Sequence, residues 1–256
     1  MGSKKRFRSS TPVLLRQANK LARLDSDLLT TIEEQVERPL IVVEQQKKPR
    51  ITFILDRACL QTGFVGKTVK LLNADEHAQS LLKQNKPLQD YRPDISHRAL
   101  LAIFDSPLSK AGFVHAIYVR TEKGVLFEVK THVRIPRTIK RFNGLMLELL
   151  QKSSIRAKDT GEKLLSVLEQ PVTRHLPENS RIIGLSYSSE KLVNLKEYVA
   201  DMSDDVNLVF VVGAMTQGTI DKNYLDDFIS VSSTPISASR CVGVICQALE
   251  KKLNIF

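Results

Sequence analysis

From Ile51 onward, short apolar runs alternate with helical patterns, and this alternation constrains the fold more than any other feature of the sequence. The expected strands cover residues 51–55, 100–104, 115–119, 124–129, 182–187 and 208–212. The expected helices cover residues 76–84, 139–152, 163–169, 195–202 and 237–253. Such alternation is typical of an α/β fold with a mainly parallel sheet. The segments 115–119 and 124–129 are expected to form a hairpin inserted into that scheme.

The chain divides into a basic extension and a folded domain. Residues 1–50 mix charge runs with one amphipathic helical pattern near Leu21–Val36, and we expect them to be partly helical or disordered. Residues 51–256 are expected to form the α/β domain. No apolar run approaches the roughly 20 residues that span a bilayer, and no secretory signal is recognisable. We therefore expect an intracellular, soluble protein without a membrane partner.

Charge points to a polyanionic partner. Lysine and arginine number 38 against 28 acidic residues, which gives a formal net charge of +10. Nucleic acid is the expected partner, and a basic chain that is merely soluble is the alternative. The three cysteines are too few and too irregularly spaced for a disulfide framework or a four-ligand zinc site. Cys241 and Cys246 fall in an apolar helical pattern and are interpreted as buried thiols.

Signatures of common catalytic sites are absent. The sequence has no phosphate-binding loop, no dinucleotide-binding glycine motif, no nucleophile elbow and no zinc-protease helix. Asn73, Asp75 and His77 match no standard metal site, and an exposed polar turn is the better interpretation. We expect no metal.

Two segments remain as candidate ligand sites. In residues 134–142, four cations fall within eight positions just before an amphipathic helical pattern, with Thr138 as its expected N-cap. Cations at the positive end of a helix dipole are locally unfavourable, and a bound phosphate would offset that cost. The second site comprises the small-residue segments 211–218 and 231–238. Gly213 follows a strand, where ligands of open α/β sheets bind. A solvated basic turn and an ordinary glycine turn are the respective alternatives.

Taken in order, the polar motifs of the chain resemble a known family. It is the eukaryotic and archaeal family of ribosome-biogenesis SPOUT enzymes that methylate N1 of a pseudouridine in small-subunit rRNA, the Nep/Emg family. The resemblance begins near Ile51 and reaches the C-terminus. The motifs that carry it are Leu71-Leu72-Asn73, Arg92-Pro93-Asp94-Ile95-Ser96-His97, Asp105-Ser106-Pro107-Leu108, Ala111-Gly112, Arg134-Ile135-Pro136-Arg137-Thr138, Arg141-Phe142, Gly144-Leu145-Met146 and Pro235-Ile236-Ser237-Ala238.

The resemblance implies a SPOUT fold with a C-terminal trefoil knot, a family-specific β-rich insertion and a homodimer whose interface lies beside the cofactor. It implies S-adenosylmethionine as cofactor, bound mainly by backbone atoms. The implied cofactor-binding residues are Leu185, Gly213, Gly218, Val231, Ser232, Ser233, Thr234, Pro235 and Ile236. The sequence departs from the family pattern at Thr234, Gln217 and Ile139, where tyrosine, a basic residue or histidine, and phenylalanine are usual.

The resemblance also implies which residues contact the RNA. Arg92, Arg134, Arg137 and Arg141 are the implied rRNA-binding residues, and Asp94 is implied to hold the guanidinium of Arg92. Asp94 is also the candidate for removing the proton from the acceptor nitrogen, with solvent as the alternative.

The implied activity is methyl transfer to N1 of a pseudouridine in small-subunit (18S) rRNA, with a role in small-subunit biogenesis. The implied partners are this rRNA, a second copy of the chain and pre-ribosomal assembly factors. The implied location is the nucleus and nucleolus. A pre-rRNA-binding assembly factor of the same fold, without catalysis, is the alternative.

Overall fold

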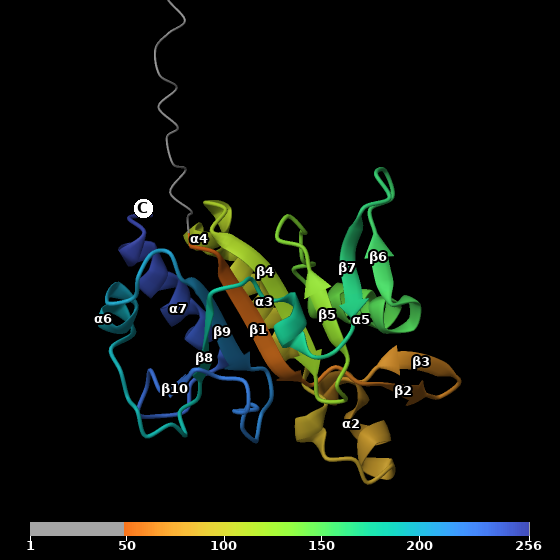
Figure 1. Ribbon diagram of the computed structural model, residues 1–256. Coiled ribbons are helices and arrows are strands. Elements are labelled where there is room, and N and C mark those ends of the chain that lie inside the picture. The colour runs from red at the N-terminus through yellow and green to blue at the C-terminus, as the bar shows by residue number, and fades with distance from the viewer. Residues whose placement is uncertain (1–48, 256) are drawn as a thin grey trace, which may run out of the picture. The chain divides into compact units, whose positions relative to one another are not determined.

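The computed structural model describes residues 49–255 (Figure 1). The amphipathic pattern at residues 21–36 and nearly all of the expected basic extension lie outside the described residues.

Within residues 49–255, eight strands form one sheet in the order β10-β8-β9-β1-β4-β5-β7-β6. In chain order these strands are β1 (Ile51–Ala58), β4 (Val114–Thr121), β5 (Leu126–Val129), β6 (Ser154–Arg156), β7 (Lys163–Leu168), β8 (Ser180–Leu185), β9 (Asn207–Gly213) and β10 (Asp227–Ile229). The strands from β10 to β4 pair in parallel. Strands β5, β7 and β6 extend the sheet in antiparallel pairing. The predicted α/β class with a mainly parallel sheet is therefore confirmed.

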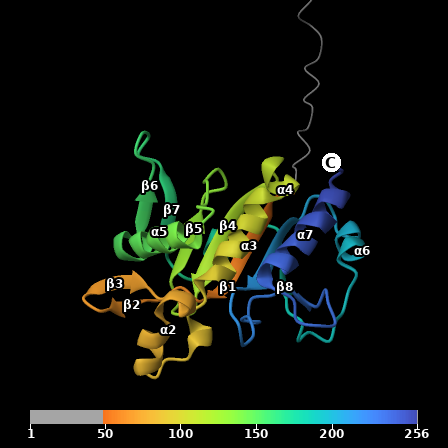
Figure 2. The same cartoon turned by 180° about the vertical axis from the view of Figure 1, so that it is seen from behind.

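The central strands are buried at nearly every position because both faces of the sheet are covered. In β1, Phe53 and Leu55 belong to one apolar cluster, whereas Ile54 belongs to a cluster on the opposite face. In β9, Phe210 and Val211 divide in the same way. Figure 2 shows α3, α5 and α7 together on one face of the sheet. The helices and helical turns are α2 (Ala74–Lys83), η1 (Leu88–Asp90), α3 (Pro93–Asp105), α4 (Pro107–Lys110), α5 (Ile139–Lys152), η2 (Val172–His175), α6 (Leu195–Ala200) and α7 (Ala238–Lys252).

The expected hairpin exists, but it is not a separate insertion. Strands β4 and β5 pair in antiparallel register, for example Tyr118 with Glu128. However, β4 also pairs in parallel with β1, as with Tyr118 and Ile54, so it belongs to the parallel half of the sheet. The β-rich addition thus consists of β5, β7 and β6 alone.

For two segments the predicted type of secondary structure was wrong. The run Leu100–Phe104, expected to be a strand, is the second half of α3. It is apolar throughout because α3 packs between the sheet and other helices, and Pro93 at its first turn suits a helix start. The run Lys163–Glu169, expected to be a helix, forms β7, which pairs with β5 and β6. Pairing with neighbouring strands overrides a short helical pattern.

A separate two-stranded sheet follows β1. Strands β2 (Thr62–Val65) and β3 (Thr68–Leu71) form an antiparallel hairpin, and α2 comes directly after it. Asn73 caps α2 by accepting a hydrogen bond from the Asp75 amide, and the Asn73 amide donates to His77 Nδ1. Asn73 and His77 are buried, so the expectation of an exposed polar turn was wrong: these side chains hold the start of a helix.

Candidate functional site

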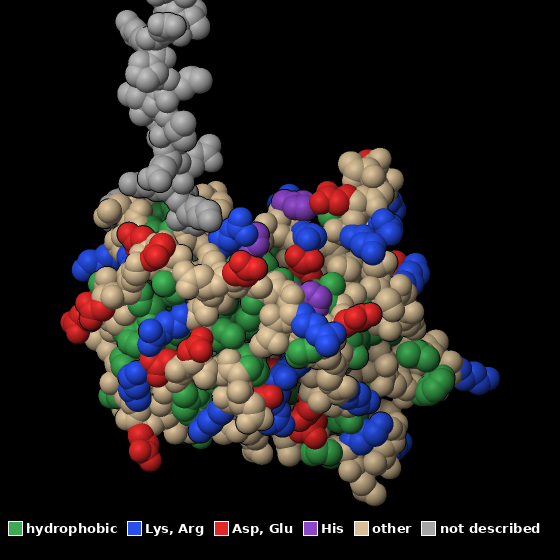
Figure 3. Space-filling view, in the orientation of Figure 1, with side chains coloured by type: hydrophobic (Ala, Val, Ile, Leu, Met, Phe, Trp, Pro, Cys, Tyr) green, Lys and Arg blue, Asp and Glu red, His purple; other side chains and the backbone are tan. Residues whose placement is uncertain are grey.

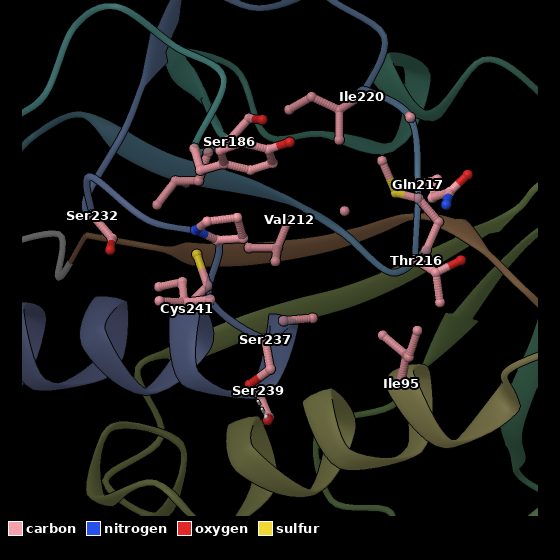
Figure 4. Close-up of a pocket in the computed structure, with 18 of the residues that line it drawn as sticks. Ile95, Ser186, Val212, Thr216, Gln217, Ile220, Ser232, Ser237, Ser239 and Cys241 are labelled. Carbon is pink, nitrogen blue, oxygen red and sulfur yellow. Dashed lines mark hydrogen bonds between the residues drawn. The ribbon is translucent and has the colours of Figure 1, made fainter. Parts of the chain in front are cut away.

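A cavity of about 370 Å³ opens at the carboxyl ends of β8 and β9 (Figure 4). It is bounded by the first turns of α3, by the segments that follow β8 and β9, and by the loop that precedes α7. In Figure 4 Ser186 and Ile220 lie on one side of it and Ser237 on the other. This place, beyond the carboxyl ends of parallel strands, is where α/β sheets bind ligands.

Most of the predicted cofactor-binding residues line this one cavity. They come from three separate segments and are Leu185, Gly213, Gly218, Val231, Ser232, Pro235 and Ile236. Ser233 and Thr234 belong to the same loop but are not among the lining residues. The departure from the family pattern at Thr234 therefore lies off the cavity wall, whereas Gln217 is part of that wall.

Two glycines of the cavity occupy places where a side chain would collide. A Cβ atom on Gly213 would lie 2.8 Å from Met215 Sδ. Gly218 has a φ of +105°, and its Cβ would lie 2.5 Å from Arg57 Nη1. Arg57 in turn donates to the Thr219 carbonyl oxygen, which holds this loop against the end of β1. Small residues here let the backbone itself form the wall.

Side-chain hydroxyls fix the path of the loop before α7. Ser230 Oγ donates to the Ser232 carbonyl oxygen over 2.7 Å, and Ser232 Oγ accepts from the Thr234 amide. Ser237 caps α7 by accepting from the Arg240 amide. These local bonds hold a chain segment that has no regular structure, and so they keep the cavity open.

Arg92 and Asp94 form a two-pronged ion pair at the edge of the cavity. Arg92 Nε donates to Asp94 Oδ1 over 2.8 Å, and Arg92 Nη2 donates to Asp94 Oδ2 over 2.9 Å. The hydrogen bonds from Arg92 lower the pKa of Asp94 below its usual value. Asp94 is therefore ionised at neutral pH and is a weak base, a property that suits holding a guanidinium better than accepting a proton.

The other three predicted RNA-binding arginines lie outside this cavity. Arg134, Arg137 and Arg141 are exposed along the segment that leads into α5. Arg137 binds Asp105 at the end of α3, with Nη2 donating to Oδ1 over 2.7 Å. Thr138 occupies the N-cap position of α5, as expected. Its side chain makes no capping hydrogen bond, however, so the expected side-chain cap is absent.

Helix α3 connects the cavity to this basic segment. Residues near its start, including Asp94, line the cavity. One turn later, buried His97 lies with Nε2 2.7 Å from the Pro136 carbonyl oxygen, and its ring stacks on Phe142 with centroids 4.7 Å apart. At its end, Asp105 binds Arg137. One helix thus holds the basic segment at three points, at Pro136, Phe142 and Arg137.

Several lining residues were missed by the sequence analysis. Those outside the predicted segments 211–218 and 231–238 are Ile95, Arg98, Ser186, Tyr187, Ile220, Ser230, Ser239 and Cys241. Ser186, Tyr187 and Ser230 directly follow a strand, where small and polar residues are common and mark a loop rather than a ligand. Cys241 is buried, as expected, and burial raises the pKa of its thiol to about 12, so it is protonated at neutral pH.

Among residues 49–255, no three His, Cys, Asp or Glu side chains gather closely enough to hold a metal ion. Over the same part of the chain, none of the helices combines the length and apolarity that a membrane crossing requires.

Comparison with known proteins places the chain in a family. Residues 53–250 match the family model described as EMG1/NEP1 methyltransferase. The chain is 43% identical over 202 residues to the ribosomal RNA small subunit methyltransferase NEP1 of Mus musculus, covering 79% of this chain and 81% of that one. It is 31% identical over 174 residues to the Nep1 of Staphylothermus marinus, covering 67% and 71%.

A solved structure has the same fold. The crystal structure of Archaeoglobus fulgidus Nep1 bound to S-adenosylhomocysteine superposes with a TM-score of 0.64 at 19% identity, covering 81% of this chain and 99% of that one. This likeness agrees with the SPOUT-type fold that was expected. With a family model matched over nearly all of the described residues, this chain belongs to the EMG1/NEP1 methyltransferase family.

Proposed function

We propose that this protein transfers the methyl group of S-adenosylmethionine to N1 of a pseudouridine in small-subunit rRNA, within small-subunit biogenesis. The observation that carries the proposal is the single cavity at the ends of β8 and β9, where three separate segments meet the Arg92–Asp94 pair. Relatives named as small-subunit rRNA methyltransferases support the same reaction.

The residues of the cavity fit this cofactor. Leu185, Val212, Ile220 and Val231 offer apolar surface for an adenine ring, and the glycines bring backbone groups within reach of polar ligand atoms. S-adenosylmethionine supplies a methyl group already activated on a sulfonium. The remaining task of the protein is to align the acceptor nitrogen with it and to let the proton of that nitrogen leave.

Arg92 and Asp94 are assigned the role of positioning the acceptor nucleotide. The paired carboxylate restricts Arg92 to one orientation at the cavity edge, where its guanidinium is suited to a phosphate or a base edge. Because Asp94 is ionised and held by two hydrogen bonds, we assign removal of the proton to solvent rather than to Asp94.

The basic segment is assigned to the RNA backbone. Arg134, Arg137 and Arg141 are exposed and follow one another along the chain, and guanidinium groups suit phosphate oxygens. A target nucleotide in an RNA loop would be splayed out to reach the cavity while these residues hold its neighbours.

We further propose a homodimer, a trefoil-knotted C-terminal region, pre-ribosomal assembly factors as partners and residence in the nucleolus. Exposed apolar side chains beside the cavity support a dimer: Tyr187 is 61% exposed and Leu192 is 59% exposed. The greater identity to the eukaryotic relatives than to the archaeal one supports a nuclear setting. We also propose that residues 1–50 are a basic extension and that residues 51–256 form the methyltransferase domain.

The test is calorimetric titration with S-adenosylmethionine, comparing the wild type with Gly213→Trp. Saturable binding that is lost in the variant supports the proposal, because an indole at this position fills the cavity wall. Gly144→Trp is the matched control, since a Cβ there meets nothing within 4 Å. Methylation of an rRNA hairpin with pseudouridine, but not with uridine, at the target completes the test. Absence of cofactor binding at millimolar concentration would instead support the RNA-binding assembly factor.

A further inference from the structure

The hairpin formed by β2 and β3 carries two exposed apolar side chains near its turn. Phe64 and Val69 are directly opposite in the register, so their side chains share one face. Phe64 is 67% exposed and Val69 is 37% exposed. Val65, the next residue, points the other way and packs against the small apolar cluster around Tyr91. Leu71, on the same face as Phe64, is buried in the main apolar cluster, and Lys70 lies on the Val65 face. The end of the hairpin nearest the domain is thus packed, whereas Phe64 and Val69 near the turn remain exposed.

The same hairpin is strongly positive. Lys67 in its turn and Lys70 in β3 are exposed, and residues 57–74 contain no aspartate or glutamate. The lysine ion pairs within residues 49–255 involve other lysines, so neither of these two ammonium groups has a carboxylate partner there. In Figure 3 hydrophobic and cationic side chains lie together at the right edge, where Figure 1 places β2 and β3.

The hairpin continues the basic segment in space. Strand β3 packs against α5, and α5 opens with the exposed cations Lys140 and Arg141. Figures 1 and 2 both show the hairpin beside α5 and α2, at the end of the sheet where β1 finishes. That is also the end at which the cavity opens, because β1, β8 and β9 are parallel.

We propose that this hairpin is a further RNA contact, in which Phe64 stacks on an unpaired base and Lys67, in the adjoining turn, binds an adjacent phosphate. The proposal rests on the proposed function, since the base belongs to the RNA whose target nucleotide enters the cavity. Aromatic side chains stack on splayed bases without regard to sequence, and nearby cations neutralise the backbone. One small apolar patch beside an unpaired cation suits a flat base in a polyanion better than a second protein surface.

The test uses the full chain and a pseudouridine-containing rRNA hairpin with single-stranded flanks. The protein has no tryptophan, so Phe64→Trp introduces its only indole. We expect this variant to bind the RNA as the wild type does, and its emission to be quenched as the RNA saturates it. Phe64→Ser should weaken RNA binding roughly 10-fold, the scale of one lost base stack. Leu82→Ser, at an equally exposed apolar position in α2, should leave RNA binding unchanged.

Each other outcome has a definite meaning. If Phe64→Ser binds the RNA as tightly as the wild type, the hairpin is not an RNA contact. The same follows if the emission of the Phe64→Trp variant does not change at saturating RNA. An emission that changes with protein concentration alone would show that a second copy covers the hairpin, which also overturns the proposal. If Arg141→Ala weakens binding and Phe64→Ser does not, only this inference fails. If the wild type binds no RNA, the proposed function fails as well.

Discussion

Asp94 interacts with two cations at the edge of the cavity. Arg92 makes two hydrogen bonds to it, and Arg98 Nη2 lies 3.9 Å from its Oδ2 on the next turn of α3. The Asp94 side chain is 10% exposed, whereas the Arg98 side chain is 71% exposed. The carboxylate is therefore a fixed centre between one ordered guanidinium and one that remains in solvent, and its ionisation controls the position of Arg92.

Asp94→Asn should destabilise the fold by about 1 kcal/mol at pH 7, a modest loss because Arg92 keeps access to water. The pKa of Asp94 is lower in the folded protein than the 3.8 of an unperturbed aspartate. Its stabilising contribution is thus complete above pH 3.8 and is lost as the pH falls through the folded value. Urea denaturation of both proteins at pH 7 and pH 3 measures this, and the difference should shrink at pH 3. An equal difference at the two pH values would contradict the assignment.

Helix α3 borders the cavity and also holds the basic segment in place. Its start borders the cavity, and its middle and end bind the basic segment through His97 and Asp105. Since a carbonyl oxygen can only accept, His97 Nε2 donates to the Pro136 carbonyl. This contact and the stacking on Phe142 determine where the arginines lie relative to the cavity.

His97→Ala should weaken RNA binding by roughly 10-fold, the effect of one lost anchoring hydrogen bond with its stacked ring, and leave cofactor binding unchanged. His97→Phe keeps the stacked ring but not the donor, so it separates the two contributions. Fluorescence anisotropy with labelled rRNA hairpin and calorimetry with the cofactor are the two measurements. Equal losses of RNA and cofactor affinity would indicate general unfolding instead of a positioning role.

The elements also show what sequence can and cannot predict. Short, nearly continuous apolar runs in β1, β4 and β9 predicted buried strands correctly, because a sheet covered on both faces requires apolar residues at successive positions. The run Leu100–Phe104 misled, since a helix packed on several sides is as uniformly apolar as a buried strand. The cavity could not be predicted from local sequence patterns, because its residues come from segments that are distant in the sequence. The order of the strands in the sheet brings the ends of β8 and β9 and the loop before α7 together. Family resemblance named individual cofactor-binding residues, whereas local chemistry named only the small-residue segments 211–218 and 231–238.

At the scale of the whole molecule, charge determines how binding responds to salt. The chain has a formal charge of +10, and three exposed arginines precede or begin α5. Each phosphate contact to single-stranded nucleic acid contributes about 0.7 to the slope of log affinity against log salt concentration. Arg137 differs from its neighbours because Asp105 competes for its guanidinium.

Arg141→Ala should therefore weaken RNA binding and reduce the salt slope by about 0.7. Lys158→Ala, at an exposed lysine between β6 and β7, is the control and should alter neither. Binding titrations from 50 to about 400 mM KCl provide both values. A slope unchanged by Arg141→Ala would mean that this guanidinium contacts no phosphate.

The position of β1 has a consequence for how the chain is made. It is the first strand of the sheet to be synthesised, yet it lies between β4 and β9, and Ile51 stands opposite Leu208. During translation its second edge has no partner until β9 has left the ribosome. Pairings between such distant segments are formed slowly, and an unpaired apolar strand is prone to aggregate. A nascent chain that ends before β9 therefore leaves one edge of β1 without its partner, and of the partly synthesised forms it is the one that this fold leaves open to association.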